Sequence, residues 1–202
     1  MKLFSWFQKS SKQDKAILSR DLVWQSELAK YQALLKLLPT TEPLFFVSFF
    51  ATEHQQLMQV FRQAGIAFSE RQSPDDLASA LVQVCLAKDL PSLPPTAAKY
   101  YFNSKHPLYE EEQKVLQKLP PNSHCFYVSF ESAFMRIFVQ ERLKTLLQRM
   151  QIAGSDAIEH RLVSTSLQAA QKKVSKALAS SLPMPALSEE AWLQQNYQGG
   201  NV

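Results

Sequence analysis

Few side chains in this sequence could act as nucleophiles or metal ligands. One pair of suitable residue types is adjacent, since Cys125 follows His124 and a histidine can activate a cysteine thiol. Neighbouring residues of a strand point to opposite faces, so the two cannot share one site there, and we interpret Cys125 as a buried core residue. With Cys85 as the second cysteine, there is neither a disulfide framework nor a zinc cluster, which favours a reducing compartment.

The remaining histidines and acidic clusters suggest structural roles. His54 and His106 stand at predicted helix starts, where polar residues are ordinary. Glu159-His160 is typical of a local cap or a surface pair, and Glu110–Glu112 of a solvated first helical turn. We therefore predict no catalytic residue, no metal site and no cofactor site.

The distribution of glycines argues against a phosphate-binding loop. Such loops need glycines so that backbone N–H groups can reach the phosphates. Gly65, Gly154, Gly199 and Gly200 are the four glycines of the chain, and none belongs to a GxxxxGK[ST] or GxGxxG run.

Positive charge is concentrated in the first 20 residues. They hold five basic residues against Asp14, which accounts for the whole net charge of +4. The other 182 residues are balanced, with 17 basic and 17 acidic side chains. A nucleic-acid-binding domain would spread its basic residues over a folded face, so we expect no nucleic-acid partner.

The N-terminal tail combines these charges with aromatic residues. It could lie on an anionic membrane surface with its aromatics inserted, or it could pack its aromatics on the domain. The apolar stretch is too short for a secretory signal, and no run approaches the length of a membrane span. We expect a cytoplasmic protein, with peripheral contact at the inner face of the membrane through Lys2, Leu3, Phe4, Trp6, Phe7, Lys9, Lys12 and Lys15.

Apolar runs and helix signals alternate along the middle of the chain, which predicts an α/β fold with a small, mainly parallel sheet flanked by helices. We expect central strands at 44–50 and 125–129, and further strands at 66–69 and 99–103. Helices are expected at 20–38, 52–64, 73–88 and 108–119. Thr52 is the expected cap of the second of these helices, and Gly65 its C-terminal glycine.

From residue 131 onward the sequence becomes helical in character. Apolar residues recur every three or four positions, which predicts a helix with one narrow stripe that must pack on something. The stripe is the expected protein-binding surface, and it consists of Val163, Leu167, Ala170, Val174 and Ala177. The predicted organisation is a tail (1–19), an α/β domain (20–130) and a helical extension with a polar tail (131–202).

The segment 126–174 resembles SecA, the motor ATPase family of bacterial preprotein translocation. The likeness rests on FYVS at 126–129, FMRIF at 134–138, AIEH at 157–160 and AQKKV at 170–174. The resemblance implies that this segment corresponds to the junction at which the family's second nucleotide-binding domain, a RecA-like fold, continues into the helical scaffold. With weaker likeness included, the resemblance covers about residues 20–178.

Two departures from the family bear on activity. The resemblance implies a first nucleotide-binding domain with Walker motifs, which this sequence lacks, and an arginine-rich loop before FYVS. Here that loop is 104–123, which contains three glutamates and no arginine.

We therefore expect a degenerate, non-catalytic SecA-like interaction module, accessory to protein translocation and with a protein partner. The alternatives are an ATPase subunit whose nucleotide site another chain completes, and an α/β domain that binds an unrelated small ligand.

Overall fold

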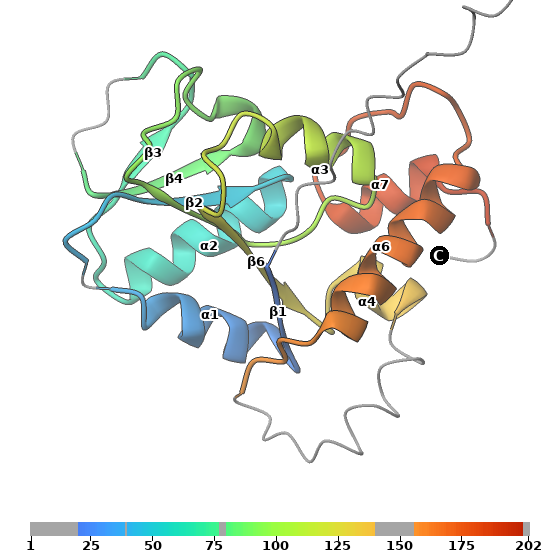
Figure 1. Cartoon of the computed structure of the whole chain (residues 1–202), viewed down its shortest axis with the longest axis horizontal. Coiled ribbons are helices and arrows are strands. Elements are labelled where there is room, and N and C mark those ends of the chain that lie inside the picture. The colour runs from blue at the N-terminus through green and yellow to red at the C-terminus, as the bar shows by residue number, and fades with distance from the viewer. Residues whose placement is uncertain (1–19, 39, 77–79, 140–155, 200–202) are drawn as a thin grey trace, which may run out of the picture.

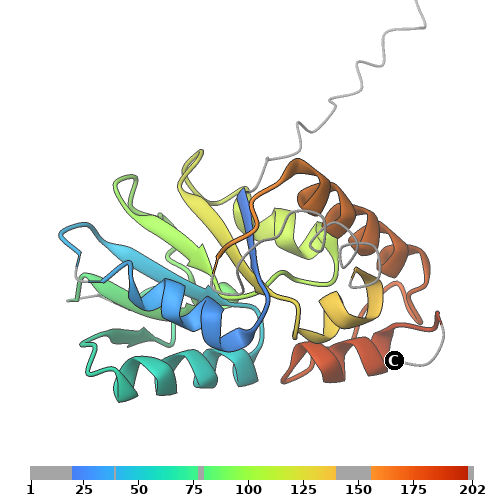
Figure 2. The ribbon, with the colours of Figure 1, turned by 90° about the horizontal axis from the view of Figure 1, so that it is seen from below.

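The computed structural model describes residues 20–38, 40–76, 80–139 and 156–199 of this chain. Six strands form one sheet in the order β1-β6-β5-β2-β4-β3, and every pair of neighbours is parallel (Figure 1). Helices cover both faces, as Figure 2 shows. The predicted α/β class is confirmed, and the sheet is larger than the four strands expected.

The elements follow one another with short connections. The strands are β1 (Arg20–Trp24), β2 (Leu44–Ser48), β3 (Ser69–Arg71), β4 (Val82–Leu86), β5 (Lys99–Phe102) and β6 (His124–Ser129). The helices are α1 (Glu27–Leu35), α2 (Ala51–Gln63), the short 3-10 helix η1 (Ala87–Asp89), α3 (Tyr109–Leu116), α4 (Ala133–Phe138), α6 (Arg161–Lys176) and α7 (Glu189–Asn196).

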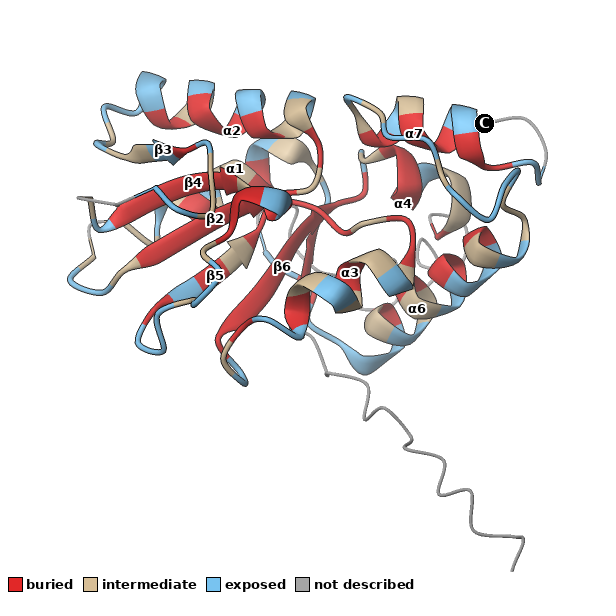
Figure 3. Ribbon diagram, turned by 90° about the horizontal axis from the view of Figure 1, so that it is seen from above, coloured by how far each residue is buried: buried red, intermediate tan, exposed pale blue. Residues whose placement is uncertain are grey.

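The two central strands were predicted correctly because both are apolar on both faces. All residues of β2 and β6 are buried, and each strand lies between two neighbours (Figure 3). Alternate residues of each strand point to opposite faces of the sheet, and each face has its own hydrophobic core. Phe45 and Phe126 pack on the side of α3, α4, α6 and α7, whereas Phe46 and Tyr127 pack on the side of α1 and α2.

The first predicted helix is wrong in its N-terminal half. Arg20–Trp24 is strand β1, which pairs in parallel with β6, and α1 begins only at Glu27. Leu22 and Val23 fit helical spacing, but they also form an apolar run with Trp24 that is buried from both sides. Non-local pairing with β6 decides between the two readings, since short apolar runs are ambiguous by periodicity.

The helix predicted for 73–88 is also wrong. Val82–Leu86 is strand β4, which lies between β2 and β3 with Val84 and Cys85 fully buried. The helix-start signal at Ser73 forms a turn instead, in which the Asp76 carboxylate accepts hydrogen bonds from the N–H groups of Gln72 and Ser73. Aspartate stabilises such turns as readily as helix starts.

Helix α2 begins and ends close to the expected positions. Phe50 occupies the N-cap position, without a side-chain cap, so the predicted capping role of Thr52 is wrong. Gly65 follows the C-cap with φ of +67°, as a helix C′ glycine should. The strand predicted at 66–69 overlaps the observed strand β3 only at Ser69.

The C-terminal helices pack on the sheet face that also carries α3. Their residues share one apolar core with the strands, and Val23 of the edge strand exchanges two backbone hydrogen bonds with Ile158 just before α6. Trp192 lies in α7, near the end of the described ranges. Within the described ranges, no helix has the length and apolar character needed to cross a bilayer.

Candidate functional site

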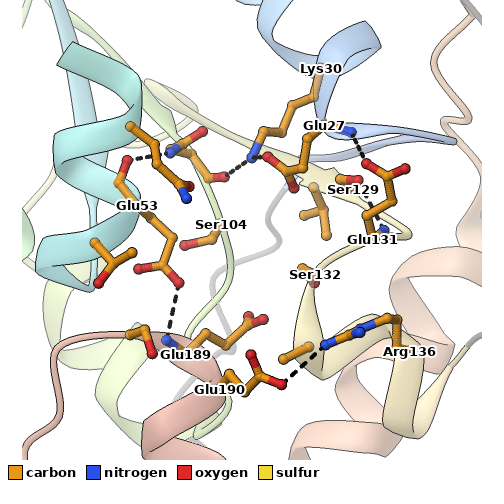
Figure 4. A pocket seen from close by; sticks show the side chains of 16 residues that line it. Glu27, Lys30, Glu53, Ser104, Ser129, Glu131, Ser132, Arg136, Glu189 and Glu190 are labelled. Atoms are coloured by element: carbon orange, nitrogen blue, oxygen red, sulfur yellow. Dashed lines mark hydrogen bonds and ion pairs between the residues drawn. The ribbon is translucent and has the colours of Figure 1, made fainter. Parts of the chain in front are cut away.

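A cavity of about 300 Å³ opens at the carboxyl ends of the central strands (Figure 4). Its walls come from five places in the sequence: α1, the start of α2, the end of β5, the turn from β6 into α4, and the start of α7. In parallel sheets the crevice beyond the carboxyl ends of the strands is where ligands bind. The chain leaves the neighbouring strands β2 and β5 in opposite directions along the sheet, toward β3 and β6 respectively. Asn103 and Ser104, which follow β5, line the cavity together with the start of α2, which follows β2.

The α1 wall carries a charged pair. Ser26 caps this helix by accepting the N–H of Ala29, which places Glu27 in the first turn and Lys30 one turn later. The Lys30 ammonium lies 2.6 Å from the Glu27 carboxylate and donates to the carbonyl oxygen of Asn103 at 3.0 Å. Lys30 is almost fully buried, so both partners are needed to compensate for its desolvation.

The α2 and α7 walls meet through two glutamates. Ser188 caps α7, and the N–H of Glu189 donates to Oε1 of Glu53 at 3.0 Å. The Glu189 carboxylate in turn accepts the N–H of Phe134 at 3.0 Å, which ties α7 to α4.

The turn from β6 into α4 closes the cavity. Ser132 caps α4, and the hydroxyl of Ser129 accepts the N–H of Glu131. Arg136 extends from α4 toward Glu190 on α7, at 3.4 Å.

Negative charge dominates the cavity. Five glutamates line it against two cations: the acids are Glu27, Glu53, Glu131, Glu189 and Glu190, and the cations are Lys30 and Arg136. Burial raises the pKa of Glu189 to about 7 and also raises the pKa of Glu53, because desolvation of each carboxylate outweighs the backbone hydrogen bonds it accepts and the attraction of Lys30. A phosphate group would meet repulsion here, whereas phosphoryl-transfer sites surround it with cations.

A second polar cluster is buried on the sheet face covered by α3 and α6 and has a structural role. The Lys105 ammonium lies 2.8 Å from Asp21 and 3.0 Å from Glu112, and all three side chains are at most 2% exposed. Gln171 of α6 donates to Glu112 at 3.0 Å, which attaches the C-terminal helix to α3. The prediction that Glu110–Glu112 is a solvated turn is therefore wrong for Glu112, although Glu110 is exposed.

The expected protein-binding stripe is used inside the molecule. Val163, Leu167, Ala170 and Val174 are 0–5% exposed, and Ala177 packs against the same core. The stripe faces the chain's own core rather than solvent, so it offers no free surface in this structure. The residues of the predicted membrane-contacting tail lie outside the described ranges.

Cys125 is a buried core residue and His160 is a helix cap, as expected. Cys85 and Cys125 are buried and free, and burial raises the pKa of each thiol to about 12, which makes them poor nucleophiles. His160 caps α6, and Glu159 forms a surface ion pair with Arg20 at 2.6 Å. Burial lowers the pKa of His106 to about 4. Among the described residues, no group of three His, Cys, Asp or Glu side chains could hold a metal ion.

The cavity residues were missed in the sequence because each looks ordinary alone. Glu27, Glu53 and Glu189 all stand in the first turn of a helix, where acidic residues are common. The usable signal was that α2 begins shortly after the carboxyl end of the predicted strand at 44–50, which directs its first turn to that edge of the sheet. This signal was missing for α1, because β1 was not predicted.

Comparison with known proteins finds local likeness to protein translocase subunits. The chain is 46% identical over 54 residues to "Protein translocase subunit SecA" of Alkaliphilus oremlandii, and 44% identical over 54 residues to the subunit of Aromatoleum aromaticum. The match to the Pseudomonas putida subunit is 41% over the same length. Each match covers 27% of this chain and 6% of the relative, and no protein-family profile matches the chain. The resemblance noted in the sequence is thus confirmed for a segment: the chain contains a SecA-like segment within an α/β fold.

Proposed function

We propose that the protein is a non-catalytic, SecA-like interaction module that acts in connection with protein translocation. The likeness to protein translocase subunits supports the link to translocation. The acidic cavity supports a role other than ATP hydrolysis, and it is the observation on which the proposal depends. It lies at the edge where a parallel sheet of this kind binds its ligand, yet its glutamates outnumber its cations by five to two.

The charge of the cavity opposes nucleotide binding in two ways. The triphosphate would lie near Glu53 and Glu189, whose ionised forms repel it. The two cations that could offset this repulsion are already in ion pairs with Glu27 and Glu190. We infer that the fold is retained as a scaffold for contact with another protein of the translocation machinery.

Nucleotide titration tests the absence of ATPase function. The purified chain should hydrolyse no ATP above background and should bind Mg-ATP and Mg-ADP no more tightly than roughly millimolar by calorimetry. Micromolar binding would contradict the proposal. It would favour instead an ATPase subunit whose site another chain completes, which would then show hydrolysis only when that chain is added.

Direct binding to a translocase component tests the partner. Purified SecA, with and without nucleotide, is immobilised and titrated with the chain in a biosensor experiment. Saturable binding in the micromolar range or tighter is expected, and no binding at concentrations of roughly 100 µM would contradict SecA as the partner. An unrelated protein of similar net charge serves as the control ligand.

A further inference from the structure

Two carboxylates of the cavity have no cation beside them. Glu53 and Glu189 lie on facing elements, the start of α2 and the start of α7, and are joined by the hydrogen bond from the Glu189 N–H to Glu53 Oε1. Lys30 pairs with Glu27, and Arg136 pairs with Glu190. Among the described residues, Glu53 and Glu189 take part in no ion pair (Figure 4).

Unused hydrogen-bonding atoms gather at the same place. Ser104, which follows β5 and lines the cavity, is only 5% exposed, and its hydroxyl oxygen has no hydrogen-bond partner among the described residues. Oε2 of Glu53 is also buried and unpartnered there. Buried polar atoms are rarely left without a partner, so the Ser104 hydroxyl and Oε2 of Glu53 are available to a bound group in this cavity.

The chain itself shows how this cavity holds a cation. The Lys30 ammonium is 3% exposed, and it is satisfied by one carboxylate at 2.6 Å and one backbone carbonyl at 3.0 Å. The opposite wall offers the same kind of partners, two carboxylates and a hydroxyl oxygen, without a cation of its own.

We propose that the Glu53–Glu189–Ser104 wall of the cavity binds an organic cation, that is, an ammonium or guanidinium group. The group would pair with the two carboxylates and donate a hydrogen bond to the Ser104 hydroxyl. A cavity of about 300 Å³ lies at the lower end of the range for small-molecule sites, which suits an extended basic side chain or a small polyamine. This inference rests on the proposed function, because a site for ATP would need the opposite charge.

General electrostatics does not explain such binding. The 182 residues after the first 20 carry equal numbers of basic and acidic side chains, so their net charge does not attract cations at long range, and only a local site would capture them. Burial raises the pKa of both glutamates, and a bound cation would favour their ionised forms.

Calorimetric titration of the full chain tests the proposal with four probes: agmatine, spermidine, an acetylated tetra-arginine amide, and Mg-ATP. Measurements are made at about pH 8, where Glu189 is ionised. Saturable binding of agmatine or spermidine would identify the ligand of the site as a free organic cation. Saturable binding of the peptide alone would identify the ligand as a basic segment of a protein.

Three variants locate the binding. Glu53→Gln and Glu189→Gln should each weaken it by about tenfold, because a hydrogen bond to a charged group is worth at least that factor. Ser104→Ala removes a hydroxyl that bonds nothing described in the chain, so the fold should be kept while affinity falls. The control is Glu111→Gln, which removes the same charge from a surface pair with Lys114 outside the cavity.

The possible results separate the two proposals. Absence of binding by all three cations, or binding that Glu111→Gln weakens as much as the cavity variants do, overturns the cation site. If ATP also fails to bind, the proposed non-catalytic function stands although the cation site is refuted. Tight binding of ATP in this cavity overturns both.

Discussion

Replacing Glu189 with glutamine should remove a pH-dependent loss of stability. The side chain is 4% exposed at the start of α7, and burial raises its pKa from the ordinary 4.5 to about 7, with the neighbouring charge of Glu53 acting in the same direction. In the unfolded chain the carboxyl ionises near its ordinary pKa. Between about pH 4.5 and 7, the folded state therefore binds more protons than the unfolded state, and stability falls as the pH rises.

The magnitude follows from the two pKa values. They differ by about 2.5, and one pKa unit corresponds to about 1.4 kcal/mol, so the group loses about 3 kcal/mol of stability across this window. Glutamine keeps an oxygen that can accept the N–H of Phe134 but has no charge to bury. The unfolding free energy of Glu189→Gln should therefore exceed that of the wild type, and the difference should grow with pH to about 3 kcal/mol above neutral pH.

Urea denaturation followed by circular dichroism measures this difference at several pH values between about 4 and 9. The matched control is Glu190→Gln, one residue along the same helix, whose side chain is 59% exposed and pairs weakly with Arg136. The unfolding free energy of Glu190→Gln should change with pH in parallel with that of the wild type. A parallel curve for Glu189→Gln as well would refute the reasoning that Glu189 is desolvated in the folded protein.

Three further variants test the packing, the turn after α2 and the tail. Lys105→Met leaves Asp21 and Glu112 buried without their cation, so denaturation should show a loss of about 3–5 kcal/mol, whereas Lys114→Met in an exposed pair should cost less than about 1 kcal/mol. Gly65→Ala forces a Cβ into a backbone with φ of +67° but meets no atom within 4 Å, so the loss should be about 1–2 kcal/mol from the backbone alone. Removal of residues 1–15 should abolish salt-sensitive sedimentation with anionic vesicles, and equal sedimentation of both forms would contradict the predicted membrane contact of the tail.

Elements with a local signature could be predicted from the sequence. Strands β2 and β6 are apolar at nearly every position, which a strand buried on both faces requires. Gly65 marked the end of α2 because few other residues accept its backbone conformation. These features depend on residues close together in the chain, and so does the SecA-like segment.

Only the tertiary structure decided the identity of β1 and β4. Their apolar residues fit a helix or a strand, and the deciding energy comes from pairing with β6 and β2, which are distant in sequence. The same holds for Glu112, which looks like a solvent-facing acid until Lys105 and Gln171 surround it.

The acidic cavity likewise exists only in three dimensions. Glu27, Glu53 and Glu189 are spread over more than 160 residues, and each alone is an ordinary acid in a first helical turn. The sequence alone predicted a helix start close to Glu53, whereas the start of α1 at Glu27 was decided by the tertiary structure. The parallel sheet brings these beginnings together at its carboxyl edge, because α1 and α2 follow parallel strands and α7 docks beside them, and burial there changes the chemistry of Glu53 and Glu189.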